Sequence, residues 1–488
     1  MKHTLRLIVT LVIAAAAGCN RRPPELQAVV DAADAMGGRD RILAVKTLTI
    51  DGEGSAPNAG QNTMPDSDLP VWKVTQFKRT IDLQNHRMRT EQVRVAQFLF
   101  ANSNTQRQDQ GLDGDVAFNA GPNGATRASA AVAKDRRMEM LQHPLVLVRA
   151  ALDPTAKLTG FRSAGGQEII EVETTTGEHI TLAIDAVTKL PSRMTTMSDN
   201  ANMGDVAIDT TFSNYEDAGG VKLPKRLTTK MDKYLQFDLQ VSKNTIDGDA
   251  SALIAPDAVK RAPIPPNAAP IVVDAEPVAK GIWWLAGSGN HRSVVFEFDD
   301  HLTLFEVPLN EARSKAVIEK ARTLSSKPLT QVIVSHHHFD HSGGLRVAVA
   351  EGLTVITYKD NIAFFKDLLA RKHTIVPDEL QMHPREATFV PVDDSMVLKD
   401  KAMEVDLYHL KDNPREGTNL FAYVPKDRIL VQADLYDSTW QFHHWGENVI
   451  TNIEQIRKLK VDRQVPVHGE IQTYAEMVKT IRDAPKGN

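Results

Sequence analysis

The sequence has a single cysteine, Cys19, among its 488 residues. Disulfides within the chain, zinc sites built on thiolates and a cysteine nucleophile in the body are therefore excluded. The chain also lacks long basic runs, and its 57 basic and 62 acidic residues give a formal net charge of −5. This balance argues against nucleic acid as a partner. Neither a Gly-x-Ser-x-Gly elbow nor a phosphate-binding P-loop is present, so neither signature supports a function here.

The remaining composition is that of an ordinary globular protein, with 42% hydrophobic and 24% charged residues. The length suits two domains or slightly more. Histidine is the informative residue type, because four of the 16 histidines fall within residues 336–341.

Residues 1–18 have the pattern of an export signal. Lys2 and Arg6 precede a run of apolar and small residues from Leu7 to Ala17. This run is too short to span a bilayer as a mature helix and is typical of a signal peptide.

The segment Ala16-Ala17-Gly18-Cys19 resembles the lipobox of bacterial lipoproteins, and an ordinary signal peptide with an incidental cysteine is the alternative. We expect Cys19 to be lipidated and residues 19–24 to be a tether, with the body on the periplasmic side of a membrane. Asn20, rather than aspartate, follows the cysteine, which resembles the sorting signal for the outer membrane.

Residues 25–255 are predicted to form a mainly antiparallel β domain. Apolar and polar residues alternate with a period of two, which is typical of half-buried strands, at 48–50, 71–74, 180–184, 206–208 and 235–241. Helices are predicted at 25–36 and, as an interruption, between about 129 and 152.

This region weakly resembles the half-barrel of periplasmic carriers of outer-membrane lipoproteins. The resemblance lies in the helix that ends at Gly37-Gly38 and in the stretch from Phe212-Ser213-Asn214-Tyr215 to Leu223-Pro224. A β domain without carrier function is the alternative.

Six prolines between residues 256 and 277 predict a semi-rigid linker. Beyond it, in residues 278–488, short apolar runs at 294–298 and 332–334 alternate with an amphipathic helix at 310–324. Alternating strands and helices predict a layered α/β domain.

A histidine-rich segment follows the apolar strand at 331–334, and it reads Ser335-His336-His337-His338-Phe339-Asp340-His341-Ser342-Gly343-Gly344. In an extended chain His336 and His338 face the same way and His337 faces away, which favours a packing role for His337. Asp340 and His341 are expected to turn inward at a corner that the glycines permit. Three imidazoles and a carboxylate suit zinc or a comparable divalent ion, whereas a solvated histidine run needs no buried strand before it.

The pattern His336-x-His338-x-Asp340-His341 after an apolar strand resembles the metallo-β-lactamase superfamily. Two later strands extend the resemblance, one ending at Asp434 and one at His468, so that it covers about residue 280 to the C-terminus. The resemblance implies an αββα sandwich with metals at one edge. It also implies two ions, one on His336, His338 and a further histidine and the other on Asp340, His341 and His468, with Asp434 between them.

Two positions depart from the family pattern. Arg415 stands where the further histidine is expected, and arginine stays protonated and cannot bind zinc. His409 is a candidate substitute, although a strand histidine beside Tyr408 is the more ordinary interpretation. Arg415 is instead expected to bind a carboxylate or phosphate of the substrate. Glu306 replaces the usual aspartate as an outer partner of the metal ligands.

These features predict a lipid-anchored, metal-dependent hydrolase that acts on an ester, lactone, amide or phosphoester bond of a small molecule. The expected cofactor is one or two zinc ions, with iron or manganese as alternatives. Asp340 would orient a metal-activated water and accept its proton, and His443 and His444 would line the substrate mouth. The rival hypotheses are a binding lipoprotein with a degenerate first site and oxidoreductase chemistry with iron.

Overall fold

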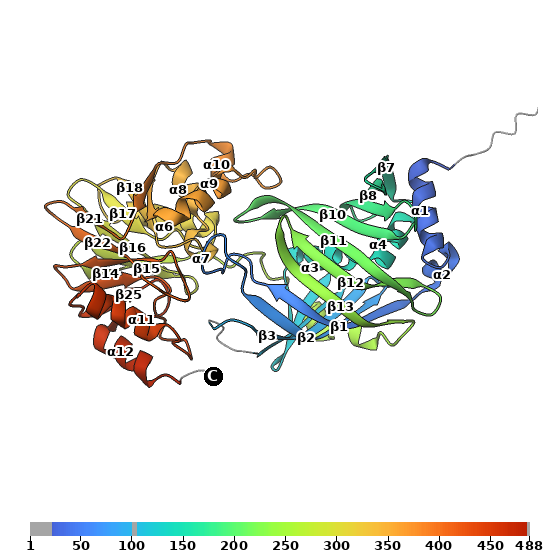
Figure 1. Ribbon diagram of the computed structural model, residues 1–488, viewed down its shortest axis with the longest axis horizontal. Coiled ribbons are helices and arrows are strands. Elements are labelled where there is room, and N and C mark those ends of the chain that lie inside the picture. Colours follow the sequence, from blue (N-terminus) through green and yellow to red (C-terminus); the bar gives the residue numbers. More distant parts are fainter. Residues whose placement is uncertain (1–21, 100–104, 486–488) are drawn as a thin grey trace, which may run out of the picture.

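The computed structural model describes residues 22–99 and 105–485, which form two domains (Figure 1). Cys19, Asn20 and the export signal lie outside these residues, so export, lipidation of Cys19 and sorting to the outer membrane remain predictions. Among the residues that the structure describes, no helix is both long and apolar enough to cross a membrane.

A single antiparallel sheet of 13 strands forms the N-terminal domain. Its strands are β1 Thr47–Pro57, β2 Val71–Asp82, β3 Arg87–Ala96, β4 Thr105–Asp113, β5 Val116–Gly121, β6 Gly124–Arg127, β7 Lys157–Ala164, β8 Gln167–Glu173, β9 His179–Asp185, β10 Pro191–Asn200, β11 Gly204–Asp217, β12 Lys222–Met231 and β13 Tyr234–Ile246. Strand β1 pairs with both β2 and β13, so the first and last strands meet in the middle of the sheet. All five segments with a period of two lie in strands, as the sequence predicts.

Four helices pack against this sheet to form its core. They are α1 Pro24–Ala35, α2 Arg39–Ala44, α3 Ala130–Leu141 and α4 Pro144–Ala151. Helix α1 is followed by Gly37, which has a φ of 129° and lies so close to Gly220 that a Cβ atom would come within 2.2 Å of its carbonyl oxygen. Glycine is required there for both reasons.

The segment 256–277 is more ordered than a linker. Helix α5, Asp257–Arg261, buries Val259 against Phe118 of the N-terminal domain. Strand β14, Val273–Ala279, is an edge strand of the next sheet, and an edge position tolerates its proline, Pro277. Residues 262–272, which contain four of the six prolines, connect the domains without helix or strand. Of the other two prolines, Pro256 precedes helix α5 and Pro277 lies in strand β14.

The C-terminal domain contains two further sheets. The first has seven strands, β14, β15 Ile282–Gly287, β16 Ser293–Glu297, β17 Leu302–Phe305, β18 Leu329–Val334, β19 Thr354–Tyr358 and β20 Phe389–Val392. The second has six, β21 Ser395–Lys399, β22 Glu404–His409, β23 Leu420–Val424, β24 Ile429–Gln432, β25 Arg463–Pro466 and β26 Gln472–Thr473.

The two sheets pack face to face between two layers of helices. In β16, Val294 and Phe296 point into the core between the sheets and Val295 points toward the outer helices. The helices on the first sheet are α6 Glu311–Arg322, α8 Leu345–Ala350 and α9 Ile362–Ala370, and those on the second are α11 Gly446–Thr451 and α12 Tyr474–Asp483. This is the αββα sandwich that the family resemblance implies, and it agrees with the layered α/β domain predicted from the alternation of strands and helices.

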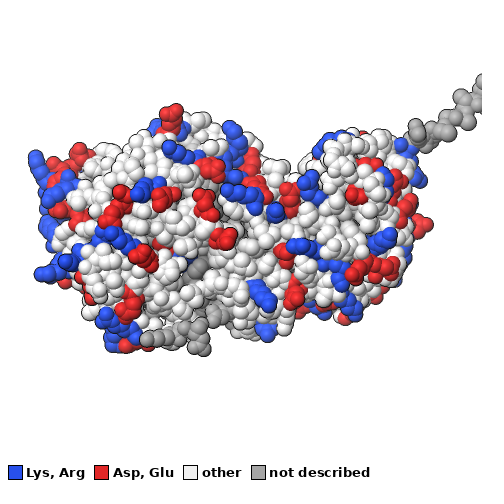
Figure 2. All heavy atoms as spheres, in the orientation of Figure 1, with Lys and Arg blue, Asp and Glu red and all other residues white. Residues whose placement is uncertain are grey.

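Among the described residues, the contacts between the domains include two sets of hydrogen bonds and ion pairs. Near the start of β11, the Asp205 carboxylate accepts hydrogen bonds from the backbone N–H groups of Thr374 and Ile375, and Arg371 forms an ion pair with Asp232. The loop between β1 and β2, residues 58–70, reaches the C-terminal domain beside the short helix α7, Phe339–Ser342 (the blue loop in Figure 1). On the face seen in Figure 2, acidic and basic side chains are interspersed over both domains.

Candidate metal centre

The candidate ligands lie at one edge of the sandwich, where strands of both sheets end. Strands β17 and β18 are parallel, as are β24 and β25, so the carboxyl ends of each pair meet at the same edge. The loop after β18 and helix α7 follow at that edge. The structure brings together there His336, His338, Asp340, His341, Asp434 and His468.

Asp340, His341, Asp434 and His468 form the more regular of two ligand groups, which we call the second site. The separations between the Nε2 atoms of the two histidines, and between these atoms and the carboxylate oxygens, are 3.2 to 3.6 Å. A tetrahedral zinc ion with ligands at about 2.0–2.1 Å keeps those ligands about 3.4 Å apart. These imidazole–imidazole and imidazole–carboxylate separations therefore match those of ligands around a zinc ion.

The charges of the second site also suit a cation. Burial lowers the pKa of His341, but Asp340, Asp434 and Glu306 outweigh it and raise this pKa well above its usual range. At His468, burial is likewise outweighed by hydrogen bonds to Asp340 and Asp434, and its pKa rises to about 9. Both shifts show that the carboxylates favour positive charge at this point, and a divalent ion would supply that charge.

Outer partners orient both imidazoles of the second site. His341 Nδ1 donates a hydrogen bond to Glu306 Oε2 at 2.6 Å, and His468 Nδ1 donates to the carbonyl oxygen of Asn290. Such partners fix the tautomer and direct Nε2 toward a metal. Glu306 and Asp434 have φ values of 75° and 59°, a left-handed backbone that costs on the order of 1–3 kcal/mol and is found most often at functional sites.

His336, His338, Glu416 and Asp434 form a second buried group, which we call the first site. His336 Nε2 lies 3.9 Å from Glu416 Oε1 and 3.8 Å from Asp434 Oδ2, and His338 Nε2 lies 2.6 Å from Glu416 Oε1. Within the described residues, neither His336 Nε2 nor either Glu416 oxygen has a hydrogen bond of acceptable geometry. Burial raises the pKa of Glu416 well above its usual range. Buried polar atoms without a hydrogen-bond partner lower the stability of the folded protein, and a divalent ion would give these atoms a partner.

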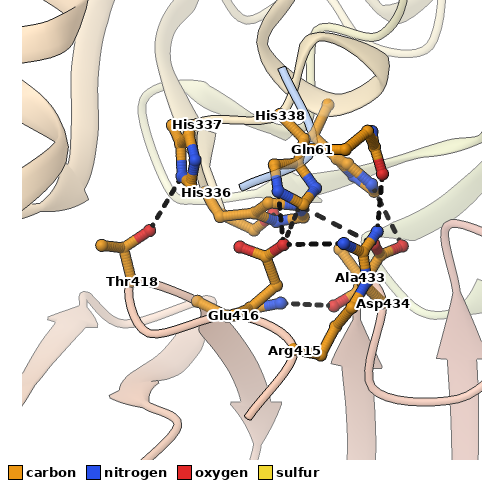
Figure 3. Close-up of polar contacts among 12 residues, drawn as sticks. Gln61, His336, His337, His338, Arg415, Glu416, Thr418, Ala433 and Asp434 are labelled. Carbon is orange, nitrogen blue, oxygen red and sulfur yellow. Dashed lines mark hydrogen bonds and ion pairs between the residues drawn. The ribbon is translucent and has the colours of Figure 1, made fainter. Parts of the chain in front are cut away.

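Arg415 lies within the first site, as Figure 3 shows. Its Nη2 atom donates a hydrogen bond to Asp434 Oδ2 at 3.0 Å, and its Nη1 atom lies 3.4 Å from Glu416 Oε1. The side chains of the three residues are at most 6% exposed, so solvent screens these charges little. The two sites are therefore unequal, because the first already contains a cation.

The remaining predicted residues lie apart from the ligands. His337 contacts Thr418 and the ring of Phe364, which agrees with a packing role. His409 stacks on Tyr358, and its Nε2 donates a hydrogen bond to the carbonyl oxygen of Gly417. Glu416, and not His409, therefore lies with His336 and His338 in the first site.

The glycines after the motif serve close packing rather than an unusual backbone. Neither has a positive φ. A Cβ atom on Gly343 would lie 2.1 Å from the carbonyl oxygen of Leu309, and one on Gly344 would lie 1.9 Å from Ser314 Oγ.

A cavity of about 210 Å³ lies beside Arg415, where the domains meet. Its walls are mainly apolar, and the lining residues are Gln61, Thr63, Asp68, Leu69, Pro70, Phe98, Leu99, Pro414, Arg415 and Trp445. Trp445 therefore lines this cavity, whereas His443 stacks on Tyr436 and His444 on Phe442.

Two residues of the centre escape prediction from the sequence. Glu416 is the neighbour of Arg415 in the loop before β23, and its acidic side chain is a weak signal. Gln61 belongs to the other domain, and its side chain contacts both Asp340 and Arg415. No local pattern points to Gln61.

Residues 286–408 match the family model described as the metallo-beta-lactamase superfamily. This range includes His336, His338, Asp340 and His341 and ends before the later ligands. The match indicates a domain similar to the metallo-β-lactamase superfamily within residues 286–408. The match does not extend into residues 25–255, where the carrier resemblance stays a prediction.

Similar solved structures include a metallo-β-lactamase from Pontibacter korlensis, with 13% identity over 43% of this chain and 100% of that chain and a TM-score of 0.35. The metallo-β-lactamase FIM-1 from Pseudomonas aeruginosa, in its mono-zinc form, is 14% identical over 43% of this chain and 94% of that chain, with a TM-score of 0.35. A metallo-β-lactamase from Hirschia baltica is 14% identical over 44% of this chain and 99% of that chain, with a TM-score of 0.34. The comparison with curated proteins gave no match.

Proposed function

We propose that this protein is a metal-dependent hydrolase with zinc as its resident ion. The observation that carries the proposal is the second site, where two imidazoles lie 3.2 to 3.6 Å from two carboxylates, a spacing that suits ligands of one zinc ion. Zinc that keeps one coordination position open to water would supply Lewis acidity and lower the pKa of that water. The match of residues 286–408 to the metallo-β-lactamase superfamily supports the same reaction class.

Asp340 and Arg415 have separate roles in this proposal. Oδ2 of Asp340 points toward His341 and His468, while its Oδ1 accepts a hydrogen bond from Gln61. A carboxylate so placed orients the attacking water and accepts its proton. Arg415 lines the cavity and binds a carboxylate or phosphate group of the substrate.

The cavity suits a small substrate, because its volume is about 210 Å³ and sites for drug-sized ligands have roughly 300–1,000 Å³. Its apolar walls favour an apolar body next to the anionic group. We therefore propose a small organic anion with an ester, lactone, amide or phosphoester bond as the substrate.

The place of action is also a proposal. The lipobox-like segment before Cys19 supports a lipid anchor and a periplasmic location, with the outer membrane favoured by Asn20. Helix α1 begins at Pro24, so the tether between anchor and folded body is short.

Turnover of a panel of small esters, lactones, β-lactams and phosphodiesters tests the hydrolase. We expect at least one to be hydrolysed by the zinc-loaded protein, with activity lost on chelation and restored by zinc. Asp340→Asn should abolish this turnover, whereas Asp462→Asn, which changes a surface carboxylate of the same domain, should leave it unchanged. Turnover that survives chelation or Asp340→Asn contradicts the proposal.

A further inference from the structure

The loop between β1 and β2 lies directly against the metal centre of the other domain. Gly417 donates its backbone N–H to the carbonyl oxygen of Thr63 at 2.9 Å, and His338 Nε2 donates to the carbonyl oxygen of Asn62 at 2.9 Å. Gly60 packs so tightly on Phe339 that a Cβ atom would lie 2.6 Å from the ring. The N-terminal domain therefore contacts the ligand-bearing segments on both sides of the first site.

The loop has a defined conformation of its own. The side chain of Asn62 is buried and donates hydrogen bonds to the carbonyl oxygens of Met64, Pro65 and Ser67. The backbone N–H of Ser67 donates to Met64, which closes the turn. This internal network fixes the position of the neighbouring residue, Gln61.

The side chain of Gln61 contacts one residue at each site, Asp340 at the second and Arg415 at the first; Figure 3 shows it beside Arg415. Its Nε2 atom donates a hydrogen bond to Asp340 Oδ1 at 3.1 Å, and its Oε1 atom accepts one from Arg415 Nη2 at 2.8 Å. The amide supplies the donor that the carboxylate needs and the acceptor that the guanidinium needs. Both of its partners are parts of the proposed active site.

We propose that Gln61 is a positioning residue of the metal centre, through which the N-terminal domain completes the active site. By binding Oδ1, Gln61 fixes the rotation of the Asp340 carboxylate so that Oδ2 faces His341 and His468. The Asp340 side chain is 23% exposed, whereas that of His341 is fully buried, so Asp340 is the ligand with the most freedom to rotate. The inference rests on the proposed function of the second site.

Gln61→Met tests this role, because methionine has nearly the same shape but neither hydrogen-bonding group. Removal of an outer partner of a metal ligand typically weakens metal binding about 10- to 100-fold. We expect Gln61→Met in the full-length chain to weaken binding of the tightest Zn²⁺ by that factor, measured by competition with a chromophoric chelator. The visible spectrum of the Co²⁺-loaded protein should also change, because Asp340 would bind differently.

Asp66→Ala is the matched control, because Asp66 is an exposed residue of the same loop. We expect it to bind Zn²⁺ as the wild type does. Melting of the metal-free proteins separates positioning from folding: Gln61→Met should melt as the wild type does within a few degrees.

Zn²⁺ binding by Gln61→Met within threefold of the wild type, with an unchanged Co²⁺ spectrum, would overturn the positioning role alone. Weakened binding that Asp66→Ala reproduces, or that follows a loss of melting temperature in the metal-free protein, would overturn it too. A wild type that binds no Zn²⁺ would instead contradict the proposed function on which the role rests.

Discussion

Replacement of Arg415 by methionine should strengthen binding of a second metal ion. The guanidinium lies 3.0 Å from Asp434 Oδ2 and 3.4 Å from Glu416 Oε1, two carboxylate oxygens that the first site offers to an ion. Methionine removes the positive charge and retains much of the length of the side chain. Unlike a histidine at this position, methionine would not add a nitrogen ligand for the metal.

The size of the effect follows from these distances. An ion bound by the two carboxylates would lie about 5 Å from the guanidinium, and at an effective dielectric constant of about 20 the repulsion is about 3 kcal/mol per unit of ionic charge. Loss of the arginine also makes the carboxylates bind protons more readily, which offsets part of the gain. We therefore expect affinity at the first site to rise roughly 100-fold, which corresponds to about 3 kcal/mol.

Zinc per chain, measured by mass spectrometry after dialysis against buffers of fixed free zinc, is the assay. The wild type should hold about one ion over the range that fills only the second site, and Arg415→Met should approach two. Arg428→Met, which removes a largely exposed arginine of the same domain, is the control and should match the wild type. A wild type that already holds two tightly bound ions, or an Arg415→Met variant that never exceeds one, would refute the reasoning.

Three further predictions concern Glu306, His143 and Cys19. Glu306→Gln should weaken zinc binding about 10-fold or more in chelator competition, because His341 Nδ1 loses its charged partner; unchanged affinity would contradict this. Burial lowers the pKa of His143 from 6.5 to about 3, so the unfolded chain binds a proton there that the folded chain does not, and stability should fall as pH drops from 6.5 toward 3 by up to about 1.4 kcal/mol per unit. Urea unfolding at pH 7 and pH 4.5 should show a smaller fall for His143→Gln than for the wild type, and equal falls would refute this. Cys19→Ala should shift the protein from the membrane fraction to the soluble fraction, and retention in the membrane would contradict the lipid anchor.

The ligands that the sequence predicts are those that local order places together. His336, His338, Asp340 and His341 follow one buried strand within six residues, so strand geometry and the short helix after it bring their side chains to one point. Alternation of apolar residues identifies the sheets for a related reason, because each side chain's face is set by its place in the strand.

Local sequence order does not predict the roles of Glu416 and Gln61. Which of the neighbours Arg415 and Glu416 faces the first site depends on a loop without periodicity, and in the structure both do. Gln61 is 279 residues from Asp340, and its role depends on how two folded domains dock. Docking is decided by surface complementarity, to which contacts such as that between Arg371 and Asp232 contribute, and no local pattern encodes it.

The metal content of the purified full-length chain tests the central claim most directly. The wild type should contain about one tightly bound zinc ion, and both His341→Ala and His468→Ala should lose it, because each removes a ligand from the second site. Equal zinc content in all three proteins would contradict the claim that these residues hold the ion.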